Sequence, residues 1–124
     1  MKREYAILIG VILILFLTAK LYVYSGANLL SPEKAKQMVK SGQLLKVIDV
    51  RTSFEYSLGH YPSAINIPIG SFSQGEIHKH NIGKKDGILV YCNTGERARH
   101  AADLLESYGY SNVYYISSTY LPLL

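Results

Sequence analysis

The chain has 124 residues, which is enough for one small domain, and it carries a net charge of +4. Half of that charge lies in residues 1–27, and no basic cluster with interleaved aromatic residues follows, so nucleic acid is not an expected partner. The single cysteine excludes an internal disulfide and forms no metal-binding pattern with the four histidines, so we expect no metal and no other cofactor.

The N-terminal segment is almost wholly apolar over residues 5–24, with only two polar residues inside it. A helix needs about 20 such residues to cross a bilayer, and the tyrosines at both ends suit the headgroup regions. The rest of the chain is too short to bury this segment on all sides as a core helix. We therefore predict a signal anchor, a single transmembrane helix, within residues 1–27, followed by one domain over residues 28–124.

The orientation of this helix follows from its flanking charges. Lys2 and Arg3 precede the apolar run, which favours a cytoplasmic N-terminus and a domain outside the cytoplasm. The alternative is a cleaved signal peptide, because small residues at 25–27 would suit a cleavage site, and the domain would then be secreted.

Local signals then predict the first elements of the domain. A short linker is expected at residues 25–30. Ser31 can cap a helix that has Pro32 at its first position, and Gly42 ends that helix. The apolar run over residues 44–50 predicts a strand.

The remaining elements alternate between short apolar strands and helices. They are a short helix from Thr52 or Ser53 through Leu58, a strand over 64–67, a helix over 71–80 that contains Gly75, a strand over 87–91, a helix over 95–108 and a strand over 113–116. This alternation predicts an α/β domain in which helices cover both faces of a small parallel sheet. Ligands of such sheets bind beyond the carboxyl ends of the strands.

Cys92 stands at such a position, directly after the strand predicted over 87–91. The amides of its loop and the N-terminus of the next helix form a cradle for anions, which favours the thiolate over the thiol. Gly95 lets the backbone turn closely around the sulfur, and Arg97 adds a planar cation that suits oxyanions. The alternative interpretation is that Cys92 is a small buried hydrophobic residue, as free cysteines often are.

Further motifs stand in a fixed order along the chain. They are Val47-Ile48-Asp49-Val50-Arg51, Glu55-Tyr56, Gly59-His60, Ala64-Ile65-Asn66-Ile67-Pro68, and Val90-Tyr91-Cys92 with Gly95 and Arg97. Together they resemble the rhodanese family over roughly residues 30–116. The resemblance implies a rhodanese-like α/β fold and a sulfurtransferase of the thiosulfate:cyanide type, in which a cysteine accepts sulfane sulfur as a persulfide.

The resemblance also implies roles for individual residues. Cys92 is the expected catalytic residue, and the expected substrate-binding residues are the others of its six-residue loop: Asn93, Thr94, Gly95, Glu96 and Arg97. Asp49 and Arg51 are expected to support the site, as a pair that holds the fold rather than as catalytic groups. The partners would be a small sulfur donor, a thiol or cyanide acceptor, the membrane through residues 5–24, and in some settings a protein that accepts sulfur.

Two other functions remain open on the sequence. One is a non-catalytic sulfur carrier or binding module at the membrane. The other is a phosphatase or arsenate reductase relative of the same fold, whose loop is one residue longer and ends in an arginine where this chain has Ala98.

Overall fold

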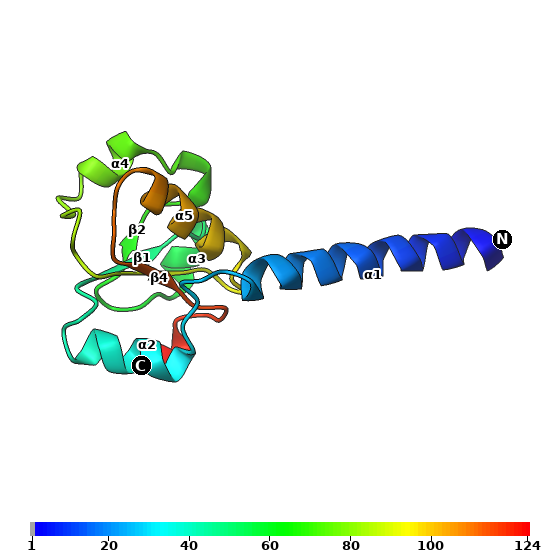
Figure 1. Ribbon diagram of the computed structural model, residues 1–124, viewed down its shortest axis with the longest axis horizontal. Coiled ribbons are helices and arrows are strands. Elements are labelled where there is room, and N and C mark those ends of the chain that lie inside the picture. The colour runs from blue at the N-terminus through cyan, green and yellow to red at the C-terminus, as the bar shows by residue number, and fades with distance from the viewer. Residues whose placement is uncertain (1) are drawn as a thin grey trace.

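The computed structural model describes residues 2–124, and a long helix, α1 (Lys2–Tyr24), projects from a small α/β domain (Figure 1). By length and composition, α1 could span a membrane or act as a signal sequence. Nearly all of its side chains are exposed, with Val23 the buried one among residues 2–24. The buried-core interpretation of this segment is therefore excluded.

The sheet has four parallel strands in the order β2-β1-β3-β4, as the alternation of elements predicts. The strands are β1 (Lys46–Asp49), β2 (Ile65–Asn66), β3 (Ile88–Tyr91) and β4 (Val113–Tyr115). Successive residues of β3 alternate between two hydrophobic clusters, with Ile88 and Val90 in one and Leu89 and Tyr91 in the other. Both faces of the sheet are therefore buried, which explains why its strands are almost continuously apolar.

Helices cover the two faces as expected. They are α2 (Pro32–Lys40), α3 (Ser53–Leu58), α4 (Gln74–His78) and α5 (Glu96–Ser107), with 3₁₀ turns η1 (Ile69–Ser71) and η2 (Leu121–Leu123). Figure 1 shows α4 and α5 on one side of the sheet and α2 on the other. Ser31 caps α2 as predicted, since its hydroxyl accepts a hydrogen bond from the Lys34 amide at 3.2 Å.

The helix expected over residues 71–80 is shorter than predicted. Its first residue, Ser71, belongs to the 3₁₀ turn η1, and α4 begins only after Ser73. The Ser73 hydroxyl accepts a hydrogen bond from the Glu76 amide at 3.2 Å, so it caps the helix at this point.

The segment expected to be a linker, residues 25–30, is instead attached to the edge of the sheet. Leu29 forms a parallel bridge with Tyr115, and the Leu30 amide donates to the Tyr115 carbonyl at 2.9 Å. The Tyr115 amide donates to the Asn28 carbonyl at 3.1 Å. Because β4 is an edge strand, its outer backbone groups need partners, and this segment supplies them.

Candidate active site

Cys92 lies at the carboxyl end of β3, at the start of the loop that leads into α5. Its side chain is buried, with 1% exposed, and the Gly95 amide donates a hydrogen bond to Sγ at 3.1 Å. Gly95 has a φ of +107°, in the left-handed region, and it is the N-cap of α5. The loop therefore folds back so that a backbone N–H at the helix N-terminus points at the sulfur, and this conformation favours glycine.

Glu55 on α3 binds two residues of this loop from the side. Its carboxylate accepts hydrogen bonds from Arg97 at 2.8 and 3.1 Å and from the Asn93 amide side chain at 2.8 Å. The Arg97 guanidinium, together with the Thr52 amide, holds the pKa of Glu55 well below its ordinary value. The carboxylate raises the pKa of Arg97 in turn, with a smaller contribution from Cys92.

This contact changes the expected role of Arg97. The sequence suggests a guanidinium that is open to substrate oxyanions, but here two of its nitrogens already contact Glu55. Glu55 was not among the predicted site residues, although it also completes a capping box with Thr52 at the start of α3. That local signal is visible in the sequence, whereas its contact with the loop is not.

Thr94 and Glu96 lie on the side of the loop that faces α1. The Thr94 hydroxyl donates to the Glu96 carboxylate, and both residues border a cavity of about 240 Å³ between the loop and α1. Ser117, which follows β4, lines the same cavity. Four of the five predicted substrate-binding residues therefore divide into two groups, with Asn93 and Arg97 turned toward α3 and Thr94 and Glu96 turned toward α1. The fifth, Gly95, donates its amide to Cys92 Sγ.

Asp49 and Arg51 form a buried ion pair below the loop. Arg51 Nε lies 3.0 and 3.1 Å from the two carboxylate oxygens of Asp49, and Nη2 lies 2.7 Å from Oδ2. The Tyr91 hydroxyl donates to Asp49 at 2.7 Å and accepts from the Tyr61 amide at 3.0 Å. Burial, followed by the hydrogen bond to Asp49, raises the pKa of Tyr91.

This network places a fixed cation beside the site. Arg51 lines a second hollow, of about 280 Å³, together with Glu55 and Asn93. Tyr91 is fully buried in β3, and its hydroxyl belongs to the network, which the apolar pattern of β3 does not reveal. His60 holds the turn after α3, since its Nδ1 lies 2.8 Å from the Tyr56 carbonyl oxygen.

The geometry identifies Cys92 as a nucleophile that contacts the N-terminus of a helix. Residues 2–124 hold no group of His, Cys, Asp or Glu side chains that could bind a metal ion. A family model described as the rhodanese-like domain matches residues 31–120, which include both the buried pair and the Cys92 loop. The chain belongs to the rhodanese-like domain family.

Curated relatives of this rhodanese-like chain are larger proteins. A tRNA uridine(34) hydroxylase of Buchnera aphidicola is 36% identical over 75 residues, which are 56% of this chain and 23% of the relative. The putative sulfur carrier protein YrkF of Bacillus subtilis is 32% identical over 84 residues, which are 68% of this chain and 44% of the relative. The chain thus spans less than half the length of either protein.

Solved structures share the rhodanese-like fold. The human single-domain sulfurtransferase TSTD1 is similar with a TM-score of 0.64 at 23% identity, over 78% of this chain and 95% of that chain. A rhodanese from E. coli described with anions is 32% identical, with a TM-score of 0.55, over 60% of this chain and 86% of that chain. The first of these similarities bears on the fold alone, and the second adds likeness in sequence.

Proposed function

We propose that this protein is a sulfurtransferase that carries sulfane sulfur as a persulfide on Cys92 and is held at a membrane by α1. The observation that carries the proposal is the hydrogen bond from the Gly95 amide to Cys92 Sγ, at 3.1 Å. An amide at a helix N-terminus that points at a sulfur stabilises negative charge on it. That charge is what a cysteine needs to attack a sulfur donor and to hold the persulfide that results.

The first half-reaction loads the sulfur. The Cys92 thiolate attacks the outer sulfur of a donor such as thiosulfate, the S–S bond of the donor breaks, and sulfite leaves with the electron pair. The loop amides stabilise the terminal sulfur of the persulfide as they stabilised the thiolate. Arg97 and Arg51 lie on the α3 side of the loop, but each is paired with a carboxylate, Glu55 and Asp49 respectively, so the loop amides provide the uncompensated positive field for an anionic donor.

The second half-reaction unloads it. A thiolate or cyanide attacks the terminal sulfur, a new bond to that sulfur forms, and the bond to Cys92 Sγ breaks to restore the thiolate. Cys92 is the only cysteine in the chain, so a second cysteine cannot resolve the persulfide within one molecule. The acceptor must therefore be a separate molecule.

Steady-state turnover tests this function. The full chain in a mild detergent is expected to convert thiosulfate and cyanide to sulfite and thiocyanate, and Cys92→Ser is expected to abolish the conversion. Ser107→Ala, at the far end of α5, is the control and should keep full activity. Unchanged turnover in Cys92→Ser would refute the assignment of the nucleophile.

A sulfur carrier is the second candidate, favoured by the name of the Bacillus subtilis relative. A carrier would accept one sulfur per chain and release it to a protein acceptor, without turnover on small acceptors. A single loading step that is followed by no thiocyanate formation would favour the carrier over the enzyme.

The proposed anchoring has its own test. A cysteine at Ser111, an exposed position, in the Cys92→Ser background is expected to react in intact cells with a membrane-impermeant thiol reagent. That result would place the domain outside the cytoplasm, as Lys2 and Arg3 predict. Labelling only after lysis would place it inside, and a chain that lacks residues 1–27 would show a cleaved signal peptide.

A further inference from the structure

The end of α1 is attached directly to the active-site loop. Val23 is 2% exposed and packs so closely on Gly95 that a Cβ at Gly95 would lie 2.8 Å from its Cγ1. Arg99 of α5 donates to the Tyr22 carbonyl and lies 4.5 Å from the centre of the Tyr22 ring. The Tyr115 hydroxyl donates to the Val23 carbonyl. These contacts from α5 and β4 fix the direction of α1 relative to the domain.

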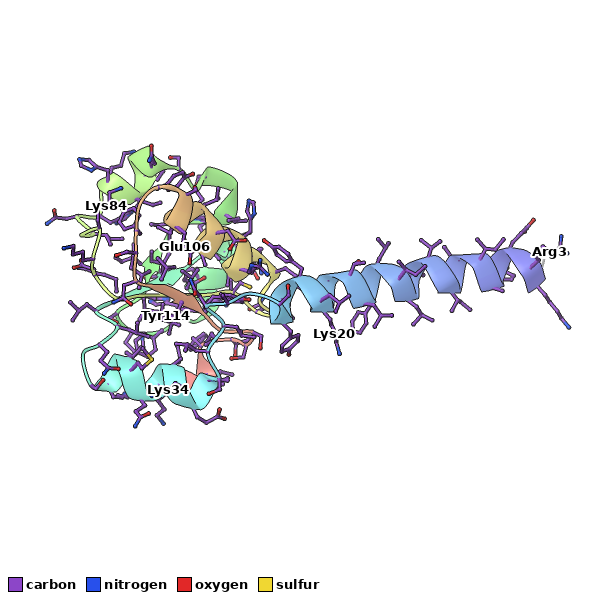
Figure 2. The ribbon with its side chains drawn as sticks, viewed as in Figure 1. Arg3, Lys20, Lys34, Lys84, Glu106 and Tyr114 are labelled. Atoms are coloured by element: carbon purple, nitrogen blue, oxygen red, sulfur yellow. The ribbon has the colours of Figure 1, made fainter. Side chains whose placement is uncertain are left out.

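α1 leaves the domain on the side where the carboxyl ends of the strands lie, and it extends outward from there. The last turn of α1 packs through Val23 on Gly95, which lies against Ser117, and these two residues follow β3 and β4. Figure 1 shows α1 leaving the domain beside the start of α5. Figure 2 shows Lys20 close to the domain and Arg3 at the far end of α1. If residues 5–24 span a bilayer, the face that carries the Cys92 loop is therefore the face turned toward that bilayer.

The cavity between α1 and the loop lies at the level where this bilayer would end. Its α1 wall includes Phe16, Ala19 and Val23, and its opposite wall includes Thr94, Glu96 and Ser117. Phe16 is about 12 Å from Tyr24 along the helix axis, at 1.5 Å per residue. Gly95 of the loop packs on Val23, where the span of residues 5–24 ends, so the loop lies at the headgroup level of a membrane that α1 spans. The cavity extends from there along α1 toward Phe16, which lies at the level of the acyl chains.

The chemistry of the cavity is amphipathic. Ala19 and Val23 present an apolar surface, whereas Glu96 and Lys20 bring one negative and one positive charge to the opening. The Lys20 ammonium lies 4.9 Å from the centre of the Phe16 ring, so its long side chain runs along the helix at this level. Such a site suits a molecule with an apolar tail and a polar head.

The surface on the α3 side of the active-site loop also carries exposed apolar side chains. Phe54 and Leu58 on α3 are 70% and 74% exposed and are four residues apart, on one face of the helix. Leu58 borders the hollow that contains Asn93 of the loop. Two large exposed apolar side chains therefore lie on the α3 side of the active-site loop, where lipid headgroups and upper acyl chains would cover them.

We propose that the cavity between α1 and the loop is a membrane-side entrance to Cys92, and that its acceptor is an amphiphilic thiol held at the bilayer surface. This inference rests on the proposed function and on a retained α1. In the transfer step, the thiolate of the amphiphile attacks the terminal sulfur of the Cys92 persulfide. The bond between that sulfur and Cys92 Sγ breaks, Cys92 leaves as a thiolate, and the amphiphile becomes the persulfide.

Sulfur transfer in vesicles tests the entrance. The full chain is placed in phosphatidylcholine vesicles, and thiosulfate is used to form the persulfide on Cys92. The acceptor is then either a phospholipid with a thiol in its headgroup or 2-mercaptoethanol. Ala19→Phe fills the cavity and should slow transfer to the lipid thiol several-fold, with transfer to 2-mercaptoethanol unchanged. Ala6→Phe, near the other end of α1, is the matched control and should match the natural chain with both acceptors. Equal transfer to the lipid thiol by Ala19→Phe and Ala6→Phe would overturn the proposal.

A second measurement does not depend on sulfur chemistry. The chain has no tryptophan, so a single substitution gives one fluorescent reporter. Leu58→Trp in vesicles with a nitroxide on the lipid headgroup should be strongly quenched. Leu45→Trp, as a matched control, should not, because Leu45 is 65% exposed and precedes β1 at the opposite end of the strands.

The two measurements separate the possible failures. Quenching at Leu58→Trp in a chain that forms no persulfide would refute the proposed function and support the position of the loop. Equal quenching at both positions, or at neither, would overturn the membrane-side entrance even if sulfur transfer proceeds.

Discussion

The carboxylate of Glu55 binds the guanidinium of Arg97 across 42 residues of sequence, with Oε1 2.8 Å from Nη1 and Oε2 3.1 Å from Nη2. The pair links α3 to the loop that carries Cys92. Because Asn93 donates to the same carboxylate, one side chain outside the loop holds two residues inside it.

Removal of this charge is expected to impair the loading of sulfur. Glu55→Gln keeps the shape of the side chain but weakens its hold on Arg97 and Asn93. We expect the rate constant for persulfide formation from thiosulfate to fall about tenfold, which corresponds to about 1.4 kcal/mol. Rapid-mixing measurement of sulfite release would detect this fall in the rate constant. Glu76→Gln, which removes an exposed pair with Lys79, is the control. Equal rates in the two variants would show that Glu55 does not organise the loop.

The same pair predicts a dependence of stability on pH. Arg97 and the Thr52 amide lower the pKa of Glu55 in the folded chain, so the unfolded chain binds a proton at this carboxyl more readily. The stabilisation is complete above the ordinary glutamate pKa of about 4.3 and is lost as the pH falls below it. The free energy of unfolding of the natural chain should therefore exceed that of Glu55→Gln at pH 7, and the two should converge in acid. Urea unfolding at a series of pH values tests this, and a constant difference would contradict it.

The buried network under the loop predicts a cost for the loss of one hydroxyl. Tyr91→Phe removes the hydrogen bond to Asp49 and leaves the Tyr61 amide without its acceptor. We expect the free energy of unfolding to fall by about 1–3 kcal/mol, because a buried polar group that loses its partner keeps its desolvation cost. Tyr114→Phe is the control, since its ring is only partly buried at the edge of the same core. Chemical denaturation of both variants gives the comparison, and similar losses would argue against the network.

Gly95 is expected to tolerate no side chain. Its φ of +107° disfavours other residues by about 1–2 kcal/mol, and a Cβ would also lie 2.8 Å from Val23 and 3.0 Å from Ser117. Gly95→Ala should therefore lower the melting temperature and slow persulfide formation. Gly42→Ala separates the two causes, since Gly42 has a φ of +84° with open space around it. If Gly95→Ala behaved like Gly42→Ala in both measurements, the contact with Val23 would have no role.

Local signals in the sequence account for much of the fold. Ser31 and Thr52 mark helix starts because the hydroxyl of a capping residue accepts from the amide three positions later, which belongs to Lys34 and Glu55 respectively. The position of Cys92 after β3 follows from the alternation of strands and helices, since a parallel sheet puts each such loop at the same edge.

Contacts between distant segments could not be predicted in the same way. Nothing local to Glu55 or Arg97 reveals that α3 and the loop meet, because the sheet order that brings them together depends on the whole domain. The bridge from Leu29 to Tyr115 also escapes the sequence, since residues 25–30 have a composition typical of a linker. The contact of Val23 with Gly95 joins two segments that the sequence assigns to separate units.

The mass of the full chain after thiosulfate treatment tests the central claim most directly. The account predicts that the chain gains one sulfur atom, that fragmentation assigns this sulfur to Cys92, and that cyanide removes it. Cys92→Ser should gain none under the same conditions. An unchanged mass in the natural chain, or a gained sulfur that fragmentation assigns to a residue other than Cys92, would contradict a persulfide on Cys92.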